Sequence, residues 1–173
     1  DLSWTSPSAL LKGKGVEEFF SKHIPCRTFE ELPIPLKVVA TDFGERKEVV
    51  FDSGELIPAI RASMSLPGIF EPVRRGSSIL IDGGLVNPLP FDLIREACDV
   101  LVAIDVSGEK TYEGENIEPG FFEILASSIQ IAAASIVDTK IQFSKPDIYI
   151  RPALTNVRVL DFDRHEEIIE SVT

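Results

Sequence analysis

Short apolar runs alternate along the chain with amphipathic segments, and turns containing glycine or proline separate most of them. β-Branched apolar runs predict strands, at 36–41, 47–51, 79–81, 100–104 and 147–150. Helical periodicity and capping patterns predict helices, at 16–20, 91–97 and 121–143, from 52 to about 65, and from 163 onward. This alternation predicts an α/β layered fold with a mainly parallel sheet.

Four of these segments carry more detailed expectations. Residues 36–41 and 47–51 are expected to pair through the turn at Gly44, whereas the uninterrupted apolar run 100–104 is typical of a strand buried on both faces. At the start of the second helix, an aspartate at 52 and a glutamate at 55 have the spacing of a capping box.

The most apolar stretch runs from Phe121 to Phe143, and charged and polar residues interrupt it. A membrane span needs about 20 predominantly apolar residues with few charges. The stretch is therefore interpreted as a long buried helix, with membrane contact as the lesser alternative. The polar segment 107–120 that precedes it predicts a surface loop rather than a domain boundary.

The composition narrows the classes of function. The chain has 173 residues, with 17 Lys and Arg against 28 Asp and Glu and a net charge of −11. An acidic chain of this kind repels phosphate backbones, so no nucleic-acid partner is expected. Two cysteines cannot build a disulfide framework or a four-thiolate zinc site, which fits a reduced, cytoplasmic compartment. No cluster of residues has the spacing of metal ligands, so no metal ion is expected, and no cofactor is expected either. The chain opens at Asp1 without a start methionine or a signal peptide, which suggests a piece of a longer protein.

Asp82 is the strongest candidate for a catalytic residue. It follows an apolar strand and precedes Gly83 and Gly84, and ligands of open α/β sheets bind beyond the carboxyl ends of strands. A carboxylate held there is partly desolvated, which raises its pKa and makes it a stronger base. On spacing alone, an aspartate that hydrogen-bonds its own turn is the competing interpretation. Asn87 is expected to hydrogen-bond within the same loop and steady it.

Four segments together resemble the patatin-like phospholipase family, above all its small bacterial members. They are Leu36-Lys37-Val38-Val39-Ala40-Thr41-Asp42, the stretch 53–73 with its Ala-Ser-x-Ser-x-Pro-Gly motif, the stretch 81–90 that opens Ile-Asp-Gly-Gly, and the stretch 98–107. The strong resemblance covers about residues 32–107. Asp-Gly-Gly alone is a weak signal, whereas its distance from the preceding motif makes the combination specific.

The resemblance implies a three-layer α/β/α fold and a lipid acyl ester hydrolase that uses a serine–aspartate dyad without histidine. Asp82 corresponds to the base, with Gly83, Gly84 and Asn87 in the site loop. The implied substrate is an acyl lipid or ester, with peripheral contact to a membrane. Catalysis of this kind needs a base because a serine hydroxyl is a poor nucleophile at neutral pH.

The sequence departs from the family pattern because it contains no Gly-x-Ser-x-Gly, the elbow that carries the nucleophile, and no glycine-rich oxyanion turn. Residues 1–173 are therefore expected to be the C-terminal portion of one patatin-like domain, without the N-terminal strands and the elbow, and inactive alone. Ser53, Ser63 and Ser65 lack the elbow and are not expected to replace it. An uncovered sheet edge would favour a homo-oligomer. The alternative function is a catalytically inactive scaffold that binds a protein partner.

Overall fold

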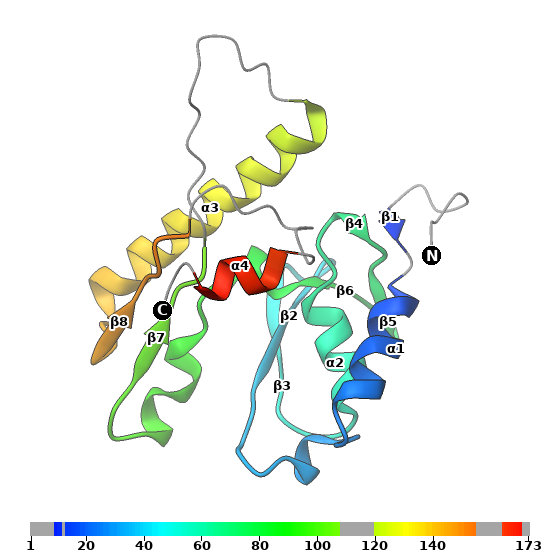
Figure 1. Cartoon of the computed structure of the whole chain (residues 1–173), viewed down its shortest axis with the longest axis horizontal. Coiled ribbons are helices and arrows are strands. Elements are labelled where there is room, and N and C mark those ends of the chain that lie inside the picture. The colour runs from blue at the N-terminus through cyan, green and yellow to red at the C-terminus, as the bar shows by residue number, and fades with distance from the viewer. Residues whose placement is uncertain (1–8, 12, 108–119, 155–163, 171–173) are drawn as a thin grey trace. The chain divides into compact units, whose positions relative to one another are not determined.

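The computed structural model describes residues 9–11, 13–107, 120–154 and 164–170 (Figure 1). The chain divides into two compact units, Asp1–Pro90 and Phe91–Thr173, each held together by its own internal contacts. The expectation that residues 1–173 belong to one domain stays a prediction.

The first unit contains Asp82 and the strands that pair next to it. Its elements are β1 (Ala9–Leu11), α1 (Lys14–His23), η1 (Phe29–Glu31), β2 (Val38–Asp42), β3 (Lys47–Phe51), α2 (Leu56–Ser63), β4 (Gly68–Phe70), β5 (Val73–Arg75), β6 (Ser78–Asp82) and η2 (Gly83–Leu85). Four of the strands form a sheet in the order β3–β2–β6–β5, and β1 pairs with β4.

The α/β class is confirmed, but the direction of the strands differs between the sheets. The pairs β1–β4 and β7–β8 (Val102–Ile104 and Ile148–Ile150) are parallel, as the sequence predicts. The four-stranded sheet is antiparallel throughout, so the expectation of a mainly parallel sheet does not hold for it. Its hairpins β2–β3 and β5–β6 have short connections, which only antiparallel neighbours allow. The hairpin through Gly44 is confirmed.

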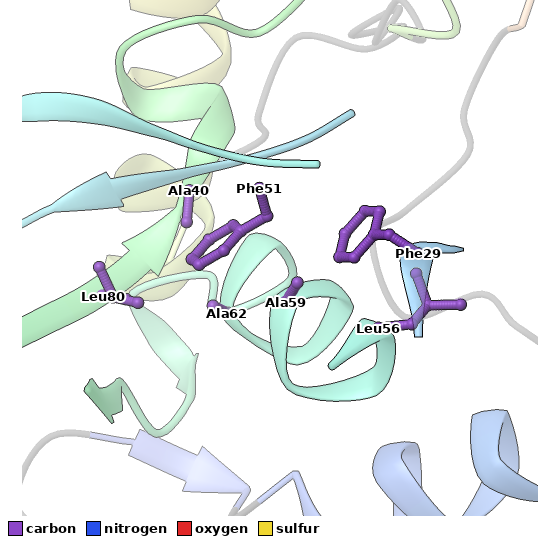
Figure 2. Packing of buried hydrophobic residues seen from close by; sticks show 7 residues of the cluster. All are labelled: Phe29, Ala40, Phe51, Leu56, Ala59, Ala62 and Leu80. Carbon is purple, nitrogen blue, oxygen red and sulfur yellow. The ribbon is translucent and has the colours of Figure 1, made fainter. Parts of the chain in front are cut away.

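The core of the first unit lies between α2 and the strands β2, β3 and β6 (Figure 2). Its buried side chains are Phe29, Ala40, Phe51, Leu56, Ala59, Ala62 and Leu80. Figure 2 shows the ring of Phe51 between its strand and α2, and the small side chains of α2 let the helix approach the sheet closely. This packing fixes the position of β6, and β6 ends at the candidate base.

The start of α2 differs from the sequence-based expectation. The helix begins at Leu56, Glu55 is its N-cap residue, and no side chain caps it, so the predicted capping box is wrong. A neighbouring loop supplies the hydrogen bonds instead: the Leu56 N–H donates to the Arg27 carbonyl (2.9 Å), and the Gly54 N–H donates to the Glu30 carboxylate (3.0 Å). A long-range contact has thus taken the role that local capping was expected to play.

The second unit contains η3 (Phe91–Ala97), β7, α3 (Phe121–Phe143), β8 and α4 (His165–Glu170). Asp147, just before β8, ties the unit together because its carboxylate accepts both the Leu101 N–H (2.7 Å) and the Arg95 guanidinium (2.6 Å). The stretch expected as a surface loop lies mostly outside the described residues, as does the aspartate expected to begin the last helix.

The burial of the second unit corrects two expectations. In α3, Val137 is the one buried side chain among those described, and Ile131 is 71% exposed, so the helix is not a buried one. In β7, Val102 and Ile104 are exposed and Ala103 is buried, so this strand is not buried on both faces. Residues 123–143 form the one helix of the described chain that is long and apolar enough to cross a membrane, although these two properties also fit the core helix of a soluble protein.

Candidate functional site

Asp82 is the last residue of β6, at the point where the strand turns into η2. Its backbone is held from two sides. The Asp82 N–H donates to the Ser65 carbonyl (3.0 Å), and the Thr41 hydroxyl donates to the Asp82 carbonyl (2.7 Å). Its carboxylate oxygen Oδ1 accepts the Gly84 N–H (2.7 Å). Two of these bonds thus fix the backbone of Asp82, and the third orients its carboxylate.

The electrostatic setting of Asp82 favours a base. Burial raises the pKa of its carboxyl above the ordinary value, and the hydrogen bond from the Gly84 N–H, which favours the charged form, opposes this effect without cancelling it. A carboxylate with a raised pKa binds a proton more strongly, as a general base must. The bond to Gly84 is also the one expected of an aspartate in a tight turn, and the two interpretations are compatible because a carboxylate has two oxygens.

A side chain would be obstructed at each of the two glycines after Asp82, but by different atoms. A Cβ at Gly83 would lie 2.1 Å from the Val39 carbonyl oxygen of β2, so the turn packs directly on the backbone of the neighbouring strand. A Cβ at Gly84 would lie 3.0 Å from Oδ1 of Asp82. Gly83 therefore allows the turn to approach β2, whereas Gly84 leaves room for the carboxylate.

Asn87 joins the loop to β3. Its N–H donates to the Gly83 carbonyl (2.9 Å), and its side-chain amide donates to the Glu48 carboxylate (3.0 Å). Asn87 is buried, so these bonds lie partly out of water and hold the loop more firmly than surface bonds would. The structure thus brings Asp82, Gly83, Gly84 and Asn87 into one loop, as the sequence predicts, although their catalytic role stays a prediction.

Two of the serines considered as a replacement nucleophile, Ser65 and Ser53, lie in different settings. Ser65 is 0% exposed, and its hydroxyl donates to the Arg61 carbonyl (2.9 Å) while it accepts from the Arg61 guanidinium (2.7 Å). Ser53 lies in the exposed loop before α2. Within the described part of the chain, no group of three or more His, Cys, Asp or Glu residues could hold a metal ion.

Sequence reasoning missed Arg61 and Ser65 as neighbours of the site. Arg61 is buried within α2, and the Ser65 carbonyl is a direct partner of the Asp82 backbone. A signal was present, because an arginine within an apolar helical segment with a serine four residues later is an unusual pattern for a buried helix. The contact between α2 and β6 that gives the pattern its meaning cannot be read from local sequence.

The raised pKa of Asp82 predicts a pH-dependent effect of Asp82→Asn on stability. Because the folded-state pKa lies above the unfolded-state value, the folded protein bears the cost of a buried charge at pH values above both. Asparagine carries no charge, so the variant should have the larger free energy of unfolding at pH 7. The gain should vanish as the pH falls below about 3.9, the ordinary aspartate value. Urea unfolding at the two pH values measures this, and a gain independent of pH would contradict it.

Comparison with known sequences agrees with this geometry. The profile of the family described as "Patatin-like phospholipase" matches residues 1–94, more than half of the chain and including the whole Asp82 loop. The chain belongs to the patatin-like phospholipase family.

Two kinds of relative are similar to the chain. An uncharacterized NTE family protein of Mycobacterium tuberculosis is 38% identical over 115 residues, which are 66% of this chain and 32% of that protein. Patatin-like phospholipase domain-containing protein 7 of Mus musculus is 27% identical over 187 residues, which are 94% of this chain and 14% of that protein. The chain thus spans about a third of the mycobacterial relative and a smaller share of the mouse one.

Proposed function

We propose that the chain is part of a lipid acyl ester hydrolase in which Asp82 is the general base for a serine that lies outside this sequence. Membership of the patatin-like phospholipase family implies a lipid hydrolase. The observation that carries the finer proposal is the Asp82 carboxylate itself, which is partly desolvated at a strand end and accepts the Gly84 N–H, while two further hydrogen bonds hold the Asp82 backbone.

The proposed reaction has two steps. In the first, Asp82 takes the proton of the serine hydroxyl as the serine oxygen attacks the ester carbonyl, and the proton then passes to the departing alcohol. In the second, Asp82 takes a proton from water, whose oxygen attacks the acyl-serine ester, and returns it to the serine as the fatty acid leaves. Backbone N–H groups would stabilise the oxyanion of each step, at roughly 3–4 kcal/mol for a good donor.

A fluorophosphonate probe tests where the nucleophile lies. The protein that contains this sequence should react with one probe per chain, and peptide mass spectrometry should place the label on a serine outside residues 1–173. Residues 1–173 expressed alone should not be labelled, because the sequence contains no Gly-x-Ser-x-Gly elbow and the buried hydroxyl of Ser65 is already bonded to Arg61. Heat-denatured protein is the control for non-specific reaction.

The other outcomes are informative. A label on a serine within residues 1–173 would contradict the proposed location of the nucleophile. A complete protein that neither reacts with the probe nor hydrolyses a p-nitrophenyl acyl ester would favour the inactive scaffold that binds a protein partner.

A further inference from the structure

Arg61 is a buried cation close to the candidate base. It lies in α2 and is 3% exposed. Its guanidinium donates to the Ser65 hydroxyl (2.7 Å) and to the Glu71 carbonyl (2.8 Å), and it lies over the Phe70 ring, 5.5 Å from the ring centre. One side chain thus connects α2 to the end of β4 and the loop after it.

The structure makes room for this guanidinium at Gly13, the residue before α1. Gly13 has φ of 74°, and a Cβ there would lie 2.0 Å from Nε of Arg61. Burial lowers the pKa of Arg61, while the charges of Glu17 and Glu71 oppose that effect. Burying a cation removes its hydration, and this cost must be offset by good geometry and hydrogen bonds. An ordinary apolar residue at 61 would avoid that cost, so the guanidinium needs a specific explanation.

Ser65 connects Arg61 to the candidate base. Its hydroxyl is bonded to Arg61 twice, as the acceptor of the guanidinium N–H and as the donor to the Arg61 carbonyl. Its own carbonyl accepts the Asp82 N–H (3.0 Å). The orientation of the Ser65 peptide, and therefore the backbone position of Asp82, depends on a bond network that Arg61 anchors.

We infer that Arg61 and Ser65 are positioning residues for Asp82, which hold the end of β6 so that the carboxylate faces the serine nucleophile. This inference rests on the proposed function. Neither side chain is expected to touch the substrate. The Thr41 hydroxyl donates to the Asp82 carbonyl, so hydrogen bonds fix the peptide groups before and after Asp82.

The network acts through geometry rather than through the positive charge of Arg61. The pKa of Asp82 is set first by burial and second by the Gly84 N–H. Displacement of a catalytic group by about 1 Å can cost roughly 100-fold in rate. Loosening the Ser65 peptide should therefore lower kcat. It should also lower the apparent pKa on the acidic side of the pH–rate profile, because the Asp82 carboxylate gains exposure to water.

Ser65→Ala tests the inference in the complete protein. It removes the hydroxyl and keeps the carbonyl that accepts from Asp82. Active sites are first counted with the fluorophosphonate probe, and kcat is then expressed per counted site. We expect kcat per site to fall by about 10-fold or more, with KM unchanged. A residue that only supports folding would lower the number of sites and leave kcat per site as it was.

Ser128→Ala is the matched control, because the Ser128 hydroxyl makes the same bond to a carbonyl four residues earlier, that of Ile124 (2.7 Å), in α3. It should leave kcat per site and the pH profile unchanged. Arg61→Lys is the second variant, since lysine keeps the charge but lacks the rigid planar fork that bonds Ser65 and Glu71 together. Arg61→Lys should show the same loss of kcat per site, and it therefore provides the test if Ser65→Ala does not fold.

The outcomes separate the inference from the proposed function. Unchanged kcat per site in Ser65→Ala and Arg61→Lys, with an active wild type, overturns the inference alone. A wild type that is inactive overturns the proposed function. In that case, ¹³C NMR titration of the Asp82 carboxyl tests the network: a pKa that falls toward the ordinary value in Ser65→Ala supports it, and an unchanged pKa overturns it.

Discussion

Asp82→Asn should lower ester hydrolysis by the complete protein by roughly 10²–10⁴-fold, the range that general acid–base catalysis typically contributes. Asparagine has nearly the same shape as aspartate and can still accept the Gly84 N–H, so the turn should keep its structure. It cannot take the proton of the serine. The loss should appear in kcat with KM nearly unchanged, and a p-nitrophenyl ester and a lysophospholipid should both report it.

Asp42→Asn is the matched control. Asp42 is a buried carboxylate at the end of β2, the strand beside β6, but its side chain accepts the N–H groups of Gly44 and Glu45 in the hairpin. Hydrogen bonding, first from the Ser78 side chain, lowers its pKa, which is the opposite of the shift at Asp82. Its substitution should leave hydrolysis within a few-fold of the wild type. Activity retained in Asp82→Asn would remove Asp82 from the mechanism.

Local patterns in the sequence were sufficient to place individual elements. The predicted bounds of β3 and α3 are those of the structure, Lys47–Phe51 and Phe121–Phe143. Both are continuous segments whose periodicity extends from end to end and whose flanks contain turn residues, so no distant contact is needed to define them. The predicted position of Asp82 at the end of a strand is confirmed for the same reason.

Properties that depend on distant contacts could not be predicted in this way. The first helical residue of α2 follows from hydrogen bonds to the loop around Arg27. The exposure of Ile131 depends on which surfaces cover α3, and composition does not contain that information. At the site, the Asp-Gly-Gly loop could be predicted, whereas the bond from Asp82 to Ser65 could not, because those residues meet only when α2 packs against β6.

Gly83→Ala should destabilise the fold more than any other single methyl group added to the loop. The new Cβ would lie 2.1 Å from the Val39 carbonyl oxygen and 2.6 Å from its carbon. These are backbone atoms of β2, a central strand, so they cannot rotate away as the end of a side chain can. Overpacking typically costs about 1–3 kcal/mol, and a backbone obstacle belongs at the upper end. The midpoint of thermal unfolding should fall by about 6–12 °C.

Two matched variants separate crowding from the mere addition of a methyl group. Gly15→Ala adds a Cβ with no atom within 4 Å in α1, and alanine there should stabilise by about 0.5–1 kcal/mol. In Gly84→Ala the new Cβ would lie 3.0 Å from the end of the Asp82 side chain. It should displace the carboxylate and lower kcat, while the midpoint of thermal unfolding falls less than in Gly83→Ala. Wild-type stability in Gly83→Ala would mean that the turn does not pack on β2 and that the position of Asp82 is not fixed by that contact.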